Sequence, residues 1–302
     1  MLIISKLYNH LKLLNTIDVF WWSKVESENS KFENFGDYLV PFLLQKLANK
    51  KIRRVNPNSN KVFRLFKKKH YFIIGSILNS ATTHTIVWGA GIVIKNEKVK
   101  SAKFLSVRGP LTRDRLIELG YKVPVRYGDP AILLALFTNN DTVKKYKLGI
   151  IPHYVDFELA NDTYQNESDV NVIDLCTNNP QDVIDSILEC KYIISSSLHG
   201  IIAAHALNIP VLWTKISNNL YGDDVKFDDY YQSLEMYNVK AVEFKHYRHE
   251  DILRLFDRYK EDVLPKKENF DKLVISLIDT FPFKKSKKFK RLIKKYLLGL
   301  KS

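Results

Sequence analysis

Residues 190–213 read CKYIISSSLHGIIAAHALNIPVLW, and this stretch carries the pattern that decides the fold. The apolar run Tyr192–Ile194 is short and rich in β-branched residues, which predicts a strand covered on both faces. Three serines follow it, and the small, apolar segment Ile201–Leu207 predicts a helix packed close against the sheet. Pro210 stops that helix before a strand that starts at Val211. Such a corner exposes hydroxyls, an imidazole and helix N–H groups together, which is a geometry that binds anions.

A short apolar run that enters a polar or glycine-containing turn recurs along the chain. Helices are predicted over Leu111–Leu119 and Gln181–Glu189. Val123–Tyr127 is interpreted as one more strand that runs into a turn, and the polar segment Lys215–Asp229 as a mobile loop. Further strands are expected at residues 70–76, 85–91, 103–108, 148–154 and 170–175.

The chain has 302 residues, enough for two domains with separate cores. Residues 138–147 are polar and lack periodicity, so we place the domain boundary there. The alternation of strands and helices on both sides predicts an α/β protein with two Rossmann-like domains that face a cleft. The expected parts are residues 1–140, residues 141–283 and a basic tail of residues 284–302.

The composition excludes several classes of protein. The net charge is +14, but nine basic residues and no acidic one lie from Lys284 onward, so the rest of the chain carries about +5 and no nucleic-acid partner is expected. The two cysteines, Cys176 and Cys190, indicate neither a disulfide framework nor a metal site. Because Met1–Trp22 lacks the pattern of a secretory signal and no run is apolar enough to span a bilayer, we expect a cytoplasmic protein.

The basic tail has two interpretations. On a helix, its apolar residues share one face, with lysines and arginines on the other. Such a segment can lie on an anionic membrane surface, which would place the protein on the inner face of the plasma membrane. Alternatively, the helix docks on the protein body and leaves a solvated basic face. The residues of the apolar face are Phe289, Leu292, Ile293, Tyr296, Leu297 and Leu300.

Asn34-Phe35-Gly36-Asp37 also has two interpretations. Asn34 or Asp37 can cap a helix that has Pro41 in its first turn. Alternatively, the motif brings a carboxylate and a close-approach glycine to a cleft. Both interpretations place this motif at the start of a helix.

An ordered set of such motifs resembles the polysaccharide pyruvyl transferase family. The resemblance spans roughly residues 30 to 215 and implies a fold like that of two-domain, GT-B-type glycosyltransferases. It also implies that a pyruvyl group moves from phosphoenolpyruvate onto two hydroxyls of a sugar in polysaccharide biosynthesis. The N-terminal domain would then take the acceptor and the C-terminal domain the donor. The motifs are residues 34–37, 74–76, 87–91, 106–110, 128–131, 151–153 and 196–200.

The donor's phosphate and carboxylate require cations and helix N-termini. Arg108 follows a strand and can make a bidentate contact to either group, while His199 and the backbone at Gly200, where a tight turn is expected, add donors. A histidine can also protonate the enol methylene or assist the departing phosphate. Asp37 or Asp129 can accept a proton from an attacking hydroxyl, unless either only caps a helix.

The predicted site combines these residues with what the resemblance implies. His153 is a further cleft-facing candidate, whereas His205 is expected to pack in its helix. Members of the family commonly carry arginine at the position of Ser197, so another basic residue must serve or donor affinity is lower. The expected catalytic residues are His199, Arg108, Asp37 and Asp129, the donor-binding residues Arg108, Ser197, Leu198, His199 and Gly200, and the acceptor-binding residues Asn34, Gly36 and Asp37.

The expected partners are phosphoenolpyruvate, as the donor substrate, and a sugar acceptor, with a lipid-linked sugar among the options. Neither a cofactor nor a metal is expected. One alternative is a glycosyltransferase of the same architecture that uses a nucleotide sugar. The other is a non-enzymatic basic protein that binds a membrane or nucleic acid.

Overall fold

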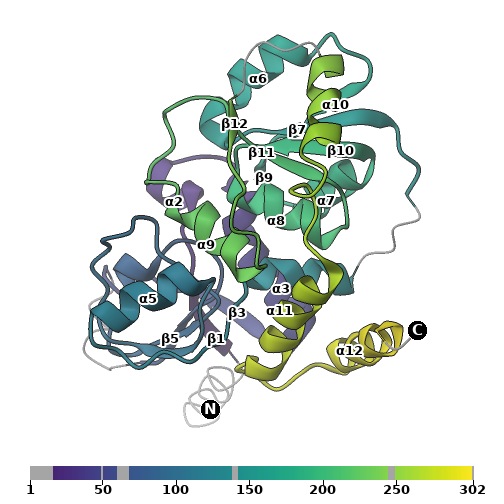
Figure 1. Ribbon diagram of the computed structural model, residues 1–302. Coiled ribbons are helices and arrows are strands. Elements are labelled where there is room, and N and C mark those ends of the chain that lie inside the picture. Colours follow the sequence, from purple (N-terminus) through teal and green to yellow (C-terminus); the bar gives the residue numbers. More distant parts are fainter. Residues whose placement is uncertain (1–15, 49, 60–67, 138–141, 244–248, 301–302) are drawn as a thin grey trace, which may run out of the picture.

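The computed structural model describes residues 16–48, 50–59, 68–137, 142–243 and 249–300 (Figure 1). Residues 1–15 of the N-terminal segment and 138–141 of the expected domain boundary lie outside this description. The N-terminal half forms a parallel five-stranded sheet of order β3-β1-β4-β5-β6. Its strands are β1 (Thr16–Phe20), β3 (Lys51–Arg54), β4 (His70–Phe72), β5 (Thr85–Trp88) and β6 (Lys103–Ser106).

The C-terminal half forms a second parallel sheet of order β12-β11-β10-β7-β8. The predicted α/β class with parallel sheets is therefore confirmed. A short antiparallel pair, β2 (Glu33–Asn34) with β9 (Cys176–Thr177), links the two halves. The strands of the second sheet are β7 (Tyr146–Ile151), β8 (Val170–Val172), β10 (Cys190–Ser195), β11 (Val211–Lys215) and β12 (Val242–Glu243).

Helices cover these sheets, and several begin where the sequence predicts. Pro110 and Pro180 occupy first-turn positions of α5 and α7, where a proline costs no hydrogen bond. The α-helices are α2 (Lys24–Glu28), α3 (Phe35–Ala48), α5 (Pro110–Glu118), α6 (Phe157–Tyr164), α7 (Pro180–Leu188), α8 (Leu198–Ala206), α9 (Val225–Ser233), α10 (His249–Arg258), α11 (Lys267–Thr280) and α12 (Lys287–Gly299). Short 3₁₀ helices are η1 (Leu78–Ser80), η2 (Pro130–Leu136) and η3 (Tyr154–Asp156).

Three local predictions are wrong. Val123–Tyr127 is not a strand, because only an isolated bridge joins Tyr127 to Val107, and Pro124 lacks the N–H that a strand ladder needs. The last five residues of the expected loop Lys215–Asp229 belong to α9. Gly200 lies inside α8 and not in a tight turn: a Cβ there would stand 2.5 Å from the Ser195 hydroxyl, so glycine allows the helix to approach the sheet.

The C-terminal helix α12 docks on the protein body. The Ser286 backbone N–H and hydroxyl donate to the carbonyls of Leu47 and Lys46 at the end of α3, each at 2.8 Å. Phe289 is fully buried, with its ring edge-on to Phe281 at 5.2 Å. The docked interpretation of the tail is confirmed. None of the described helices is both long and apolar enough to cross a membrane.

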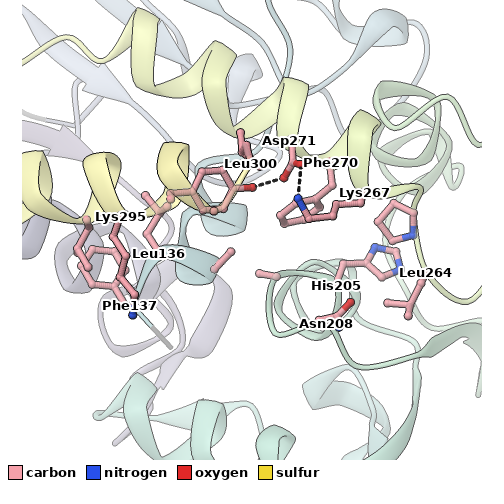
Figure 2. A pocket seen from close by; sticks show the side chains of 16 residues that line it. Leu136, Phe137, His205, Asn208, Leu264, Lys267, Phe270, Asp271, Lys295 and Leu300 are labelled. Carbon is pink, nitrogen blue, oxygen red and sulfur yellow. Dashed lines mark hydrogen bonds and ion pairs between the residues drawn. The ribbon is translucent and has the colours of Figure 1, made fainter. Parts of the chain in front are cut away.

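A cavity of about 480 Å³ remains beneath part of α12 (Figure 2). Leu136 and Phe137 come from the η2 side, and Lys295 and Leu300 from α12. On the α11 side, Lys267 donates to Asp271 at 2.9 Å. None of the seven family motifs lines this cavity, although His205, Ala206 and Asn208 from the stretch 190–213 do.

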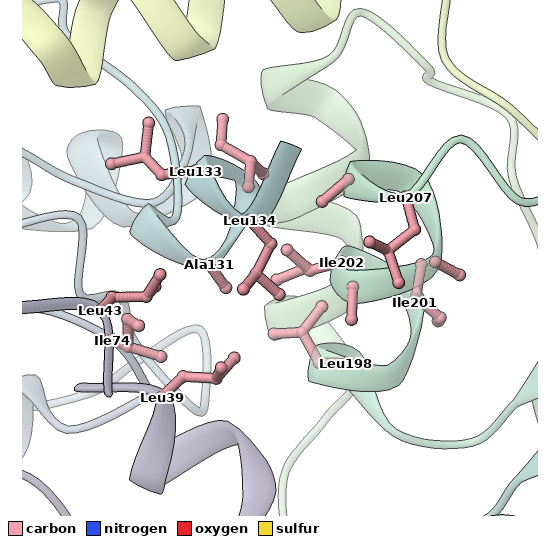
Figure 3. Packing of buried hydrophobic residues seen from close by; sticks show 14 of the residues in the cluster. Leu39, Leu43, Ile74, Ala131, Leu133, Leu134, Leu198, Ile201, Ile202 and Leu207 are labelled. Carbon is pink, nitrogen blue, oxygen red and sulfur yellow. The ribbon is translucent and has the colours of Figure 1, made fainter. Parts of the chain in front are cut away.

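The largest buried cluster joins the two halves (Figure 3). Ala131 and Leu134 of η2 lie beside Ile202 of α8 and Leu39 of α3, and all four side chains are fully buried. Burying a leucine or isoleucine side chain stabilises a fold by about 1.5–3 kcal/mol. This packing therefore fixes the start of η2, where Asp129 lies, relative to the start of α8, where His199 lies.

Candidate active site

A cavity of about 490 Å³ receives side chains from both halves of the chain. Its walls include turns that follow β4, β7 and β10, so it lies where parallel strands end, the usual place for a ligand in such folds. The polar residues from the N-terminal half are Glu28, Asn34, Asp37, Ser76, Asn79 and Ser80, and those from the C-terminal half include His153, Tyr154, Ser197, His199 and Lys226.

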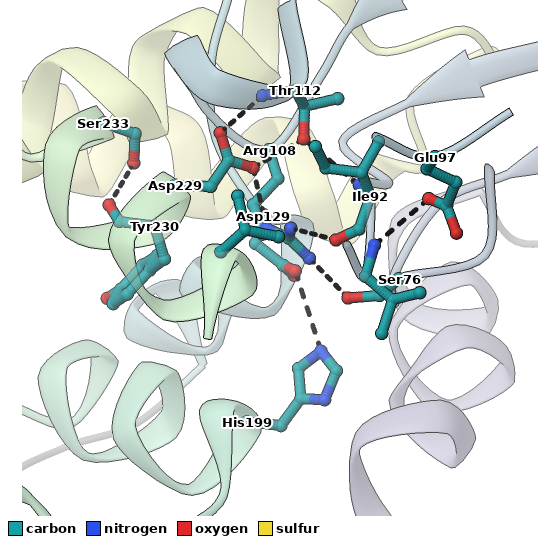
Figure 4. Close-up of polar contacts among 12 residues, drawn as sticks. Ser76, Ile92, Glu97, Arg108, Thr112, Asp129, His199, Asp229, Tyr230 and Ser233 are labelled. Carbon is teal, nitrogen blue, oxygen red and sulfur yellow. Dashed lines mark hydrogen bonds and ion pairs between the residues drawn. The ribbon is translucent and has the colours of Figure 1, made fainter. Parts of the chain in front are cut away.

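His199 and Asp129 face each other across the junction of the halves (Figure 4). His199 Nε2 lies 3.6 Å from Asp129 Oδ2, and neither atom has a hydrogen-bond partner within the described residues. The other oxygen of Asp129 accepts from the Ala131 N–H at 3.0 Å, so Asp129 also caps η2. Asp129 is fully buried and does not line the cavity. It can orient the imidazole and balance its charge after protonation.

Gly36 leaves the space that the His199 ring occupies. A Cβ at residue 36 would stand 2.1 Å from His199 Nδ1, so only a glycine lets the imidazole lie against the first turn of α3. The Asn34 side chain accepts from the Gly36 N–H at 3.0 Å and so caps this helix. Pro41 therefore lies inside α3 and not in its first turn. Both interpretations of the motif are correct for different residues: Asn34 caps the helix, whereas Gly36 and Asp37 lie at the cavity.

Asp37 is a half-buried carboxyl in the cavity wall. Burial raises its pKa to about 7, and the nearby His199 opposes this rise only in part. Near neutral pH, Asp37 therefore exists in both protonation states. A carboxyl with such a pKa can donate a proton in one step and accept one in another.

His153 also lines the cavity, and its backbone N–H donates to the Ser196 hydroxyl at 2.8 Å. Burial, followed by the charge of Lys226, lowers the pKa of His153 to about 4. It is therefore neutral at neutral pH and offers the site a hydrogen-bond donor or acceptor. His205 behaves as expected: it is buried in α8, with Nδ1 3.0 Å from the Tyr230 hydroxyl.

The N-terminus of α8 opens into the cavity through Ser197, Leu198 and His199. Ser197 occupies the cap position without a capping bond from its side chain, and its N–H donates to the Ser195 hydroxyl at 3.0 Å. The next three N–H groups, through Gly200, have no acceptor among the described residues. Gly200 itself does not line the cavity. Free N–H groups at a helix N-terminus are suited to an anion.

Arg108 does not face the cavity, contrary to expectation. Its guanidinium is fully buried and donates to Asp229 at 2.9 Å, to the Ser76 hydroxyl at 2.7 Å and to the Ile92 carbonyl at 2.6 Å. Because Ser76 does line the cavity, Arg108 reaches the site through this hydroxyl. Arg108 therefore positions Ser76 and does not contact the donor directly.

Sequence reasoning missed Ser76, Lys226 and Asp229. Lys226 and Asp229 were hidden by the interpretation of residues 215–229 as a loop. The spacing of Phe227, Tyr230, Tyr231 and Leu234 is helical and would have revealed α9. Ser76 lies in the motif 74–76, but its part in the site could not be read from it, because that part depends on Arg108, which is distant in sequence.

Comparison with protein families matches residues 34–218 to polysaccharide pyruvyl transferase. The chain belongs to this family. It is 34% identical over 221 residues to the uncharacterized protein L143 of Acanthamoeba polyphaga mimivirus, a match that covers 71% of this chain and 74% of the relative. It is also 29% identical over 172 residues to the succinoglycan biosynthesis protein ExoV of Rhizobium meliloti (strain 1021), covering 53% of this chain and 52% of ExoV. The family match includes Asp37, Arg108, Asp129 and His199.

Proposed function

We propose that this protein transfers a pyruvyl group from phosphoenolpyruvate onto two hydroxyls of a sugar during polysaccharide biosynthesis. Its membership of the polysaccharide pyruvyl transferase family supports pyruvyl transfer, and the similarity to ExoV supports the polysaccharide context. The observation that carries the proposal is one cavity that joins the free N-terminus of α8 to Asp37 and His199. This combination can bind an anionic donor and move protons beside it.

The first step needs a proton on the donor's methylene carbon. Protonated Asp37 supplies this proton, and the resulting oxocarbenium-like carbon is attacked by one sugar hydroxyl, whose proton passes to His199. The carbon then carries one sugar oxygen and the phosphate. In the second step the other hydroxyl adds as phosphate leaves. Its proton passes to the Asp37 carboxylate, and His199⁺, whose charge Asp129 balances, gives its proton to the departing phosphate.

The two parallel sheets support an assignment of sides. We propose that the halves are two Rossmann-like domains of a GT-B-like arrangement, with the acceptor on the side of Asn34, Asp37 and Ser76. The donor then lies on the side of α8, where the unpaired N–H groups are. The absence of arginine at Ser197 leaves this side with one cation fewer than expected.

We also propose that the docked α12 brings the enzyme to an anionic membrane through the face that stays exposed, where a lipid-linked acceptor would be available. Leu297 and Leu298 are 40% and 58% exposed, and the basic residues of α12 are exposed around them. Co-sedimentation with vesicles containing phosphatidylserine should be lost when residues 284–302 are removed. Equal co-sedimentation of the truncated and full-length proteins would contradict this membrane contact.

Product mass spectrometry tests the main proposal. The full-length protein is incubated with phosphoenolpyruvate and a panel of free, nucleotide-linked and lipid-linked sugars. We expect two products: a sugar whose mass has increased by that of a pyruvyl ketal, and free phosphate. Thermal stabilisation by phosphoenolpyruvate is expected in parallel. Stabilisation by a nucleotide sugar alone, with transfer of its sugar, would replace this proposal with the glycosyltransferase alternative.

A further inference from the structure

Lys226 is a cation in the cavity wall, on the first turn of α9. It is half-buried, and no carboxylate lies within ion-pair distance of its ammonium group among the described residues. The ammonium nitrogen of Lys226 lies 5.3 Å from the centre of the Phe227 ring, a cation–π contact. Leaving such a charge half-buried without a counterion costs free energy, which an anionic ligand would recover.

The acidic residues around Lys226 are committed elsewhere or only partly charged. Asp224 forms an ion pair with Lys215, and Glu28 of the cavity wall accepts from the Tyr154 hydroxyl at 3.2 Å. Asp37 has its pKa raised to about 7. Burial and the nearby charge of Arg108 lower the pKa of Lys226 to about 8, so the Lys226 side chain is mostly protonated at neutral pH. None of these carboxylates therefore forms an ion pair with Lys226 among the described residues.

Helix α9 holds Lys226 firmly in this position. Asp229, three residues further along α9, accepts from Arg108 and from both the N–H and the hydroxyl of Thr112, at 2.9, 2.9 and 2.6 Å. Gly109 lies so close that a Cβ there would stand 1.9 Å from the Asp229 carbonyl oxygen. Because this buried contact fixes α9 against α5, Lys226 enters the cavity from a rigid support.

We propose that Lys226 binds the phosphate or carboxylate of the donor and supplies the positive charge that is missing at Ser197. The inference rests on the proposed function for the identity of the donor. Lys226 and the N-terminus of α8 line the same cavity, so an anion between them would contact an ammonium group and backbone N–H groups together. Lys226 belongs to a different helix from Ser197, which is why its part cannot be seen in the motif around His199.

Isothermal titration calorimetry with the full-length protein tests this proposal. Phosphoenolpyruvate and inorganic phosphate are titrated separately into the wild type and into Lys226→Met, Lys226→Arg and Lys240→Met. Lys226→Met should weaken binding of phosphoenolpyruvate by about 10- to 100-fold, the range for loss of a charged hydrogen bond. Lys226→Arg should retain most of the affinity. Lys240 is exposed and lies outside the cavity, so Lys240→Met should bind like the wild type.

The outcomes separate the two proposals. If the wild type binds phosphoenolpyruvate and forms the ketal but Lys226→Met binds it equally well, the part given to Lys226 is wrong and the function stands. If the wild type transfers sugar from a nucleotide donor, the proposed function fails, and the effect of Lys226→Met on inorganic phosphate still decides whether Lys226 is an anion receptor. A wild type that binds neither anion would overturn both. Melting temperatures of the variants no lower than that of the wild type ensure that the comparison concerns folded protein.

Discussion

The substitution Asp37→Asn should stabilise the protein at alkaline pH while it abolishes most of the activity. Burial raises the pKa of Asp37 from 3.8 to about 7. The folded protein therefore keeps this proton over a pH range in which the unfolded chain has lost it, and each pH unit of that range costs the fold about 1.4 kcal/mol. The full difference corresponds to about 4 kcal/mol, and we halve it to about 2 kcal/mol because water in the cavity screens a half-buried group.

The sign of the effect sets the experiment. Stability is unaffected by this group below pH 4, falls as pH rises from about 4 to 7 and stays low above pH 7. The asparagine side chain of the variant cannot ionise, so the variant should equal the wild type near pH 4 and exceed its unfolding free energy by about 2 kcal/mol at pH 8. Urea unfolding followed by circular dichroism at pH 4, 6 and 8 measures this difference. Ketal formation by the variant should fall by about 100-fold or more.

Asp279→Asn is the matched control, because Asp279 is an exposed aspartate on α11. It should show no pH-dependent gain relative to the wild type. Parallel pH profiles for the wild type and Asp37→Asn would refute the raised pKa of Asp37. A variant that is more stable at pH 8 and fully active would leave the electrostatic argument intact but remove Asp37 from the chemistry.

Three further substitutions address the remaining parts of the site. His199→Ala should lower transfer by about 100-fold in product assays with little change in melting temperature, and near-wild-type rates would contradict its role. Gly36→Ala should lower transfer by about tenfold or more, because the new methyl would occupy the space of the His199 ring; an unchanged rate would mean that the ring can move without loss. Arg108→Met should lower the unfolding free energy by about 3–5 kcal/mol, since it leaves Asp229 buried without its ion-pair partner. In the same urea assay, the double variant Arg108→Met with Asp229→Asn should recover part of this lost free energy.

The strands were predictable because a strand buried on both faces needs a short β-branched run. Such runs mark β5 and β10, and the residues after them form the turns of the site. Val123–Tyr127 has a similar composition, yet Pro124 prevents a continuous ladder. Helix α9 was missed because four aspartates lie within residues 223–229, and its apolar spacing becomes clear only from Phe227 onward.

The contents of the cavity were less predictable than its location. A strand end followed by an arginine predicts a ligand contact, but whether the guanidinium faces solvent depends on partners that are distant in sequence. Arg108 is buried because Asp229, 121 residues later, meets it at the start of α5. Likewise, the spacing of His199 and Asp129 reveals neither the separation of 3.6 Å nor the cap on η2. These relations arise from the packing of the two halves.

Asp37 and Lys226 link donor binding to proton uptake. The pKa of Asp37 is raised to about 7 and that of Lys226 lowered to about 8 in the cavity. A bound phosphate would raise both values, because a negative charge disfavours the carboxylate and favours the ammonium. The donor would thus place Asp37 in the protonated state that its methylene requires.

This coupling predicts that the protein takes up protons when phosphoenolpyruvate binds at pH 8. The phosphate of phosphoenolpyruvate is already ionised at this pH. Titration calorimetry in buffers of different ionisation enthalpy should show uptake of up to about one proton by the wild type. Asp37→Asn and Lys226→Met should each take up less, while Lys240→Met should match the wild type. Binding with no proton uptake, or with release, would show that the donor's charge does not act on these two groups, and the protonation of Asp37 would then need another source.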